Sequence, residues 1–125
     1  MDRPWRRLER RCRKVGRRST DAELHRVRIL AKRARYAADA LAPAFGRRAE
    51  RFADAAADLQ DVLGEQHDAV VAAAWLRSTA IGSSPAAAFA GGLMSQREQV
   101  LARKKRKSWR RSWKKLDRPK MKFWR

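Results

Sequence analysis

Cysteine is almost absent from this sequence, since Cys12 is the only one among 125 residues. A single thiol cannot form an internal disulfide or a zinc site built from several thiolates, and it fits a reducing cytoplasm. Long hydrophobic runs are absent as well: the longest, at residues 69–76, has eight residues, whereas a membrane span needs about 20. No apolar segment follows the charged N-terminus. We therefore expect a cytoplasmic protein without a signal peptide or a membrane span.

Acidic residues are scarce relative to basic ones, with 13 Asp and Glu against 32 Lys and Arg and a net charge of +19. The excess lies at the two ends of the chain: residues 1–35 carry +10 and residues 103–125 carry +12, whereas residues 36–96 carry −3. Self-repulsion of this size is relieved when a polyanion binds, so the distribution predicts a polyanionic partner. The alternative is an Arg-rich surface that is merely solvated.

Helix-forming residues dominate, and no alternating run of β-branched residues is long enough for a strand, so the sequence predicts an all-α protein. We expect four helices, at about residues 4–14, 20–42, 47–79 and 85–116. The expected boundary signals are a capping box at Thr20–Glu23, Pro43, a Ser84 cap before Pro85, and Asp117–Pro119. Short connections predict an up-and-down bundle that forms one domain over residues 1–125.

The spacing of apolar residues predicts the face of each helix that enters the core. The expected core residues are Trp5, Leu8, Cys12 and Val15, then Leu24, Val27, Ala31, Ala34, Ala38 and Leu41, then Phe52, Ala56, Leu59, Leu63, Val70 and Ala74, and finally Phe89, Leu93, Gln96 and Val100. On the other side of the last helix, Trp109, Trp113 and Leu116 form an apolar strip. This strip needs cover, either from the N-terminal helix, from Phe123–Trp124, or from a second chain.

A row of basic residues follows one face of the second helix, beside its apolar face. The row consists of His25, Arg28, Lys32 and Arg35, with Tyr36 at its border and Asp39 at its end. Like charges three and four residues apart destabilise an isolated helix. The row therefore favours a face that binds an anion, the alternative being an ordinary solvated basic face.

The third helix carries Gln60, Gly64 and His67 between its core face and an acidic face. Gly64 costs about 1 kcal/mol relative to alanine inside a helix, so we expect another chain or a ligand to approach closely there. His67 is either a hydrogen-bonded residue at the edge of the core or a ligand-binding residue.

In the last helix, the sector of the apolar stripe continues as cations whose charged heads can reach a groove. These cations are Lys104, Lys107, Arg111 and Lys114. A third row, Arg6, Arg10, Arg13 and Arg17, is a further candidate for anion binding.

The segments His25–Tyr36 and Leu59–Asp68 together resemble the CHAD family, the conserved histidine α-helical domain. Its first motif contains a leucine–histidine pair, then an arginine, a lysine and an arginine–tyrosine pair, and it is matched by Leu24, His25, Arg28, Lys32, Arg35 and Tyr36. Its second motif is matched by Leu59, Gln60, Leu63, Gly64, His67 and Asp68. The resemblance covers about residues 20–76.

The resemblance implies an all-helical domain that binds inorganic polyphosphate in a basic groove or pore, with a link to polyphosphate granules. It assigns binding to His25, Arg28, Lys32, Arg35, Tyr36, Gln60 and His67. Lys104, Lys107, Arg111 and Lys114 are added because Lys and Arg pair with phosphate oxygens.

The length of the chain departs from the family, because a complete domain has two related helical halves and is about twice as long. The chain is similar to the C-terminal half, with residues 1–18 as the tail of a connecting helix, 20–79 as the motif helices and 84–116 as the basic C-terminal helix. Either an N-terminal half is missing, or a half stands alone, or two copies pair as a homodimer.

Three other functions compete with polyphosphate binding. Non-sequence-specific nucleic-acid binding would use Trp109, Trp113 and Trp124 to stack bases. A metal-dependent phosphohydrolase could use His67–Asp68, but it needs further ligands and the chain has only two histidines. A basic amphipathic helix at 96–116 could lie on a membrane surface. No nucleophile–base pair, glycine loop for phosphate or carboxylate pair stands out, so we expect a binding module without enzymatic activity, metal or cofactor.

Overall fold

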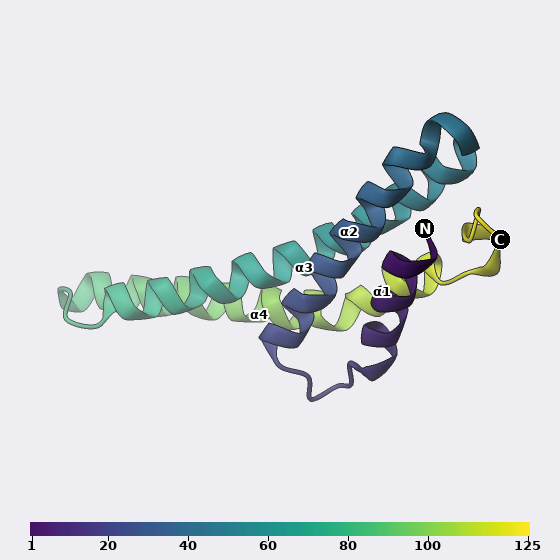
Figure 1. Cartoon of the computed structure of the whole chain (residues 1–125). Coiled ribbons are helices and arrows are strands. Elements are labelled where there is room, and N and C mark those ends of the chain that lie inside the picture. Colours follow the sequence, from purple (N-terminus) through teal and green to yellow (C-terminus); the bar gives the residue numbers. More distant parts are fainter.

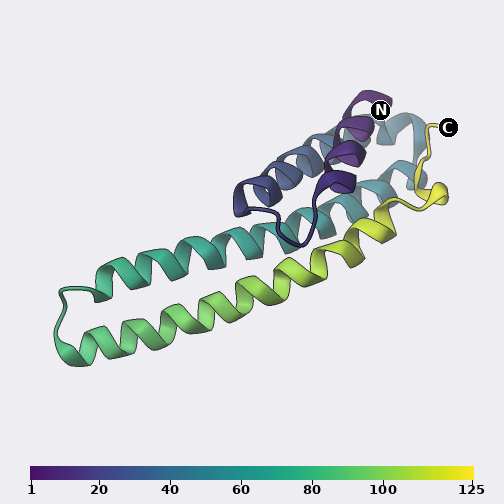
Figure 2. The same ribbon diagram turned by 90° about the horizontal axis from the view of Figure 1, so that it is seen from below.

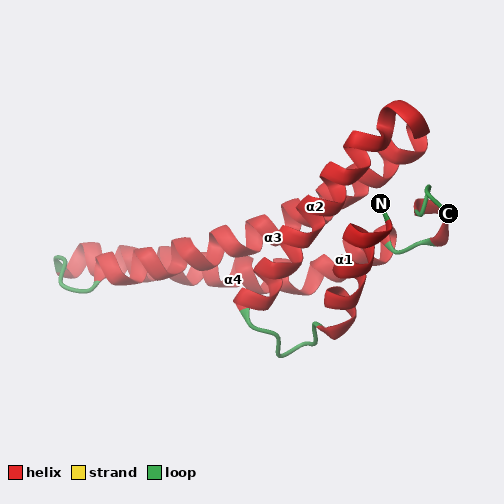
Figure 3. Cartoon of the chain, in the orientation of Figure 1, coloured by secondary structure: helices red, strands yellow, loops and turns green.

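The computed structural model describes all 125 residues, and its regular structure is entirely helical (Figures 1 and 3). The helices are α1 (Asp2–Lys14), α2 (Asp21–Phe45), α3 (Arg47–Ala80) and α4 (Pro85–Leu116), followed by the short 3-10 helix η1 (Pro119–Met121). The predicted all-α bundle of four helices is confirmed. None of these helices is both long enough and apolar enough to cross a membrane.

The predicted caps stand at the starts of α2 and α4. The Thr20 hydroxyl accepts a hydrogen bond from the Glu23 backbone N–H at 3.1 Å, and the Ser84 hydroxyl accepts one from the Ala87 N–H at 3.3 Å. Each hydroxyl satisfies a backbone donor that has no partner within its helix. These short polar side chains therefore set where the two helices begin.

The end of α2 differs from the prediction, because the helix continues through Pro43 to Phe45. A proline in the last turn removes one backbone hydrogen bond but keeps a helical φ, so the helix can tolerate it there. The turn comes at Gly46, whose φ of 55° favours glycine. The Gly46 N–H closes the helix by donating to the Ala42 carbonyl at 2.7 Å.

The long helices α3 and α4 run antiparallel over their whole length, whereas α1 and α2 cover only the end that lies near both chain termini (Figure 2). The other end projects as a two-helix hairpin, which we call the arm and define as residues 70–101. The rest of the chain is the body. The 22 buried residues of the hydrophobic core all lie in the body.

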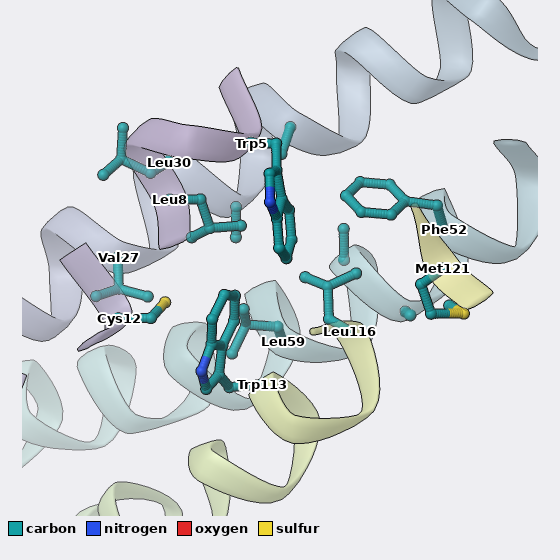
Figure 4. Packing of buried hydrophobic residues seen from close by; sticks show 14 of the residues in the cluster. Trp5, Leu8, Cys12, Val27, Leu30, Phe52, Leu59, Trp113, Leu116 and Met121 are labelled. Atoms are coloured by element: carbon teal, nitrogen blue, oxygen red, sulfur yellow. The ribbon is translucent and has the colours of Figure 1, made fainter. Parts of the chain in front are cut away.

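The core of the body is centred on the indole of Trp5, which is fully buried (Figure 4). It stacks on Trp113 with ring centroids 5.5 Å apart and meets Phe52 edge-on at 5.8 Å. Trp113 is therefore covered by α1, one of the three expected covers, and the whole strip formed by Trp109, Trp113 and Leu116 is buried within the chain. A second chain is therefore not needed to bury this strip. The homodimer was predicted to form through this surface, which is not exposed.

The apolar stripe predicted for the first half of α4 is wrong. Phe89, Leu93 and Val100 are 72%, 59% and 50% exposed, and Gln96 is exposed as well. Small residues form the contact with α3 instead: a Cβ on Gly91 would lie 2.7 Å from the Cβ of Ala80. The two backbones approach too closely for a large side chain to fit between them.

The burial predicted for the α3 stripe is also partly wrong in the arm. Ala74 is exposed and Val70 is half-buried, whereas Ala73 is buried. The buried hydroxyl of Ser95 in α4 donates to the Ala73 carbonyl at 2.9 Å. Leu41, near the end of α2, is half-buried.

Candidate functional site

The two motifs meet where α2 crosses α3. The imidazole rings of His25 and His67 lie with centroids 4.6 Å apart. Arg28, one turn after His25, lies against Gly64, because a Cβ built on Gly64 would come within 3.1 Å of the Arg28 Nε. Gln60 precedes Gly64 by one turn on the same face of α3. We call these five residues the histidine cluster.

The close approach predicted at Gly64 is confirmed, and the group that approaches is the guanidinium of Arg28. Gly64 itself is buried. Any side chain at this position would compete with Arg28 for the same space. The glycine therefore positions a cation between the two helices.

The histidine cluster contains buried polar atoms without partners. Five buried side-chain nitrogen or oxygen atoms in the protein have no hydrogen-bond partner, and three of them are His25 Nδ1, Arg28 Nε and Gln60 Oε1. Most buried polar atoms in proteins are hydrogen-bonded, so three unpartnered atoms in one cluster need an explanation. A ligand that supplies oxygen atoms would satisfy the donors, and the Gln60 amide can also turn its NH₂ group toward an oxyanion.

The rest of the α2 row lies further along the helix at the surface. The Lys32 ammonium is 5.6 Å from the ring centroid of Tyr36, which is 55% exposed. Arg35 Nε is 3.8 Å from Asp39 Oδ2, an exposed pair of small energy. Neither Arg28 nor Lys32 forms an ion pair, so the row keeps most of its positive charge.

The predicted α4 row and the histidine cluster do not share any of the principal cavities. Lys104, Lys107, Arg111 and Lys114 are all exposed, and the cavities that Lys107 and Arg111 line contain no residue of the cluster. Arg111 lines a cavity between α3 and α4 that also contains Asp58, Asp61 and Glu65. Lys107 lines a different, strongly basic cavity. The row is thus divided between a cavity of mixed charge, which also contains Lys105, Lys115 and Arg118, and a purely basic one.

The third basic row, on α1, is largely engaged with neighbouring groups. Arg6 lies 3.3 Å from Asp2, and Arg13 lies 3.0 Å from Glu9. The hydrogen bond from Arg13 to Glu9 is the main reason that its pKa is raised above the usual value. Arg10 donates to the Arg6 carbonyl at 3.3 Å, so Arg10 and Arg17 are the two members of the row without an ion pair.

One junction was not visible in the sequence. The buried Gln66 donates from Nε2 to Asp21 Oδ1 at 2.7 Å, and Arg106 Nη1 donates to the same oxygen at 3.0 Å. This contact ties the start of α2 to both α3 and α4 near the histidine cluster. In the sequence Asp21 looked like a residue of the capping box alone.

Cys12 and Asp68 have potentially reactive side chains, but neither is part of the histidine cluster. Cys12 is buried in the core, and burial raises the pKa of its thiol, so the thiol stays protonated and unreactive. No three or more His, Cys, Asp and Glu side chains converge on a point where they could hold a metal ion. Asp68, next to His67, is exposed.

Comparison with known families gives one match, in which the model of the CHAD domain aligns with residues 1–77. The matched segment comprises α1, α2 and most of α3, and it includes every residue of the histidine cluster. The basic part of α4 lies outside it. Curated proteins and solved structures give no match to the chain.

Proposed function

Since the chain belongs to the CHAD family, we propose that it binds inorganic polyphosphate at the crossing of α2 and α3. The observation that carries this proposal is the set of unpartnered buried atoms in the histidine cluster. They lie beside Arg28 and Lys32, which have no acidic partner. An oxyanion placed there would satisfy both the missing hydrogen bonds and the uncompensated charge.

The chemistry of the row suits a linear phosphate polymer. Arg28 and Arg35 offer planar guanidinium groups that can pair with two non-bridging oxygens at once, while Lys32 offers a point charge. His25 and His67 can donate hydrogen bonds to the same chain. A row of this kind advances about 5 Å per helical turn, which allows successive phosphates to meet successive cations. Tyr36 and Gln60 complete the set proposed at the crossing, while Lys104, Lys107, Arg111 and Lys114 stay a separate predicted row on α4.

We favour a binding module over an enzyme. The groups that the cluster offers are guanidinium, ammonium, imidazole and amide groups, which hold an oxyanion through donated hydrogen bonds. We propose that the protein acts in the cytoplasm, in contact with polyphosphate granules.

Nucleic acid is the weaker alternative, because the proposed stacking residues are inside the protein. Trp109 and Trp113 are only 2% and 8% exposed, and Trp124 is half-buried. Trp75 is 64% exposed but lies in the arm. Stacking on aromatic side chains is the main sequence-tolerant contribution to single-strand binding, and only Tyr36 borders the basic row.

A titration with labelled long-chain polyphosphate at several salt concentrations tests the proposal. Affinity should fall steeply with salt, because each neutralised phosphate releases a condensed counterion. Arg28→Gln/Lys32→Gln should weaken binding by about tenfold or more, since hydrogen bonds to charged groups contribute about 1.5–3 kcal/mol each. Orthophosphate should compete poorly.

The matched control is Arg47→Gln/Arg48→Gln, which removes the same charge from an exposed part of α3 that forms no ion pair. It should change the affinity by about threefold at most through the long-range field. Affinity that is indifferent to salt, or equal losses in the two variants, would contradict a specific basic site at the crossing.

A further inference from the structure

A second basic pocket lies between the α1–α2 connection and α4. Its volume is about 630 Å³. Five of its seven lining residues are cations and none is acidic; the seven are Gly16, Arg17, Leu24, Arg103, Arg106, Lys107 and Arg110. We call it the α4 pocket. It shares only Lys107 with the predicted α4 row, and it includes none of the histidine cluster.

The α4 pocket concentrates like charges in a short length of helix. Its four α4 cations stand at positions i, i+3, i+4 and i+7 and span about 10 Å along the helix axis. Each of these spacings brings two positive charges together and destabilises the helix. Arg17, Arg103 and Lys107 form no ion pair in the structure, so no direct contact with an acidic side chain offsets their repulsion.

The remaining two arginines are held in place by contacts behind the pocket. Arg106 is fixed by Asp21, which also accepts a hydrogen bond from Gln66. Arg110 donates from Nη2 to the Val15 carbonyl at 2.8 Å, and its guanidinium carbon lies 5.2 Å from the ring centroid of Trp109. Two guanidinium groups are thus oriented in advance, which lowers the conformational entropy that these side chains lose when a ligand binds.

We propose that the α4 pocket binds a short linear oligophosphate, of the pyrophosphate or tripolyphosphate class. A single orthophosphate carries too little charge to engage five cations, whereas three linked phosphates can contact several of them. Leu24 is the only apolar side chain in the lining, and no aromatic ring is present. A nucleobase would therefore find no stacking partner, and the phosphate groups alone would be recognised.

The test measures tripolyphosphate binding by calorimetry to three variants that each remove two positive charges. Arg17→Gln/Arg103→Gln alters the α4 pocket at two exposed residues. Arg28→Gln/Lys32→Gln alters the histidine cluster, and Arg47→Gln/Arg48→Gln serves as the control. Only the pocket variant should lose about tenfold or more in affinity, and the other two should change by about threefold at most.

Thermal denaturation gives a second readout that separates binding from folding. Without ligand, the pocket variant should melt at or above the temperature of the unmodified protein, because like-charge repulsion is removed. Tripolyphosphate should raise the melting temperature of the unmodified protein and of the control. It should raise the melting temperature of the pocket variant much less. A ligand-free pocket variant that melts far lower would make these arginines structural and overturn the site.

Competition experiments distinguish the source of the phosphate. Tripolyphosphate should displace a nucleoside triphosphate and a single-stranded DNA of equal charge. Tighter binding of the DNA, or equal affinity losses in all three variants, would overturn the α4 pocket as an oligophosphate site. The proposed polyphosphate function fails by a different result, namely long-chain binding that is insensitive to Arg28→Gln/Lys32→Gln, so the two failures are distinguishable.

Discussion

The body and the arm share α3 and α4 but are packed in different ways. In the body, α1 and α2 cover α3 and α4, and large side chains such as Trp5 and Phe52 fill the space between them. In the arm, α3 and α4 meet only each other, and Ala73 and Ser95 are its only buried residues. Eight of the ten exposed large hydrophobic residues of the protein lie in the arm.

Charge follows the same division. The arm carries a net charge of +1 from Arg77, Arg97 and Glu98, so +18 of the total of +19 belongs to the body. The region with a filled core therefore holds nearly all the cations, including both basic sites. Packing energy is thus concentrated where charge repulsion is greatest, while the arm has little of either.

The largest expected effect is a core truncation in the body. Trp5→Ala removes a fully buried indole from between Trp113 and Phe52, and such truncations cost about 3–5 kcal/mol. Trp75→Ala in the arm removes an indole that is 64% exposed and should cost about 0.5 kcal/mol or less. Urea denaturation of both variants measures the difference, and similar losses would show that the arm is packed as firmly as the body.

The next effect concerns the contact between the two helices of the arm. Gly91→Ala places a Cβ 2.7 Å from that of Ala80, so the helices must separate, at a cost of about 1–2 kcal/mol. Gly92→Ala is the matched control, because its new Cβ would meet nothing within 4 Å and should stabilise the helix by up to about 1 kcal/mol. Thermal melting shows whether each substitution raises or lowers the stability. If both variants were stabilised, the two helices of the arm would be able to separate without a cost in free energy.

A third glycine lies in the body and affects binding more than stability. Gly64→Ala places a Cβ 3.1 Å from Arg28 Nε, and the half-exposed Arg28 side chain can move aside to admit it. The variant should therefore melt at or above the unmodified protein, because alanine favours the helix. It should bind polyphosphate several-fold more weakly, because Arg28 is displaced. Unchanged affinity would show that the position of Arg28 is not important.

The sequence predicted the parts of the structure that depend on local chemistry. Thr20 and Ser84 were identified as caps because a hydroxyl beside free backbone N–H groups has a single local role. The family resemblance assigned His25 and His67 to one binding set, but the contact between their rings was not predicted. Pro43 was misjudged because its effect depends on the distance to Gly46, where the backbone turns.

Contacts between distant segments could not be predicted. In the arm, Phe89 and Leu93 had the stronger hydrophobic pattern, but Gly91 and Ser95 allowed the closer approach of the backbones, and the sequence does not show which of the two prevails. The α4 pocket was missed for a related reason. Arg17 and Arg103 are far apart in the chain, and only the packing of the α1–α2 connection against α4 brings them together.

The smallest expected effect lies at the end of the body, where the two termini meet. Trp124 Nε1 donates to Asp2 Oδ1 at 2.6 Å. This hydrogen bond is the main reason that the pKa of Asp2 is lowered. The positive charges of Arg125 and Arg6 lower it further. Because the pKa is lower in the folded state, ionised Asp2 stabilises the protein above its unfolded pKa of about 3.9, and this stabilisation is lost as the pH falls through the folded value.

Asp2→Asn should therefore melt slightly below the unmodified protein at neutral pH, and the difference should disappear in acid below the folded pKa of Asp2. Melting temperatures measured between neutral pH and about pH 2.5 test this, with Asp39→Asn as the control. Asp39 forms only an exposed contact with Arg35 at 3.8 Å, so its replacement should leave the pH dependence unchanged. Parallel pH profiles for Asp2→Asn and the unmodified protein would mean that the contact between Asp2 and Trp124 does not stabilise the fold.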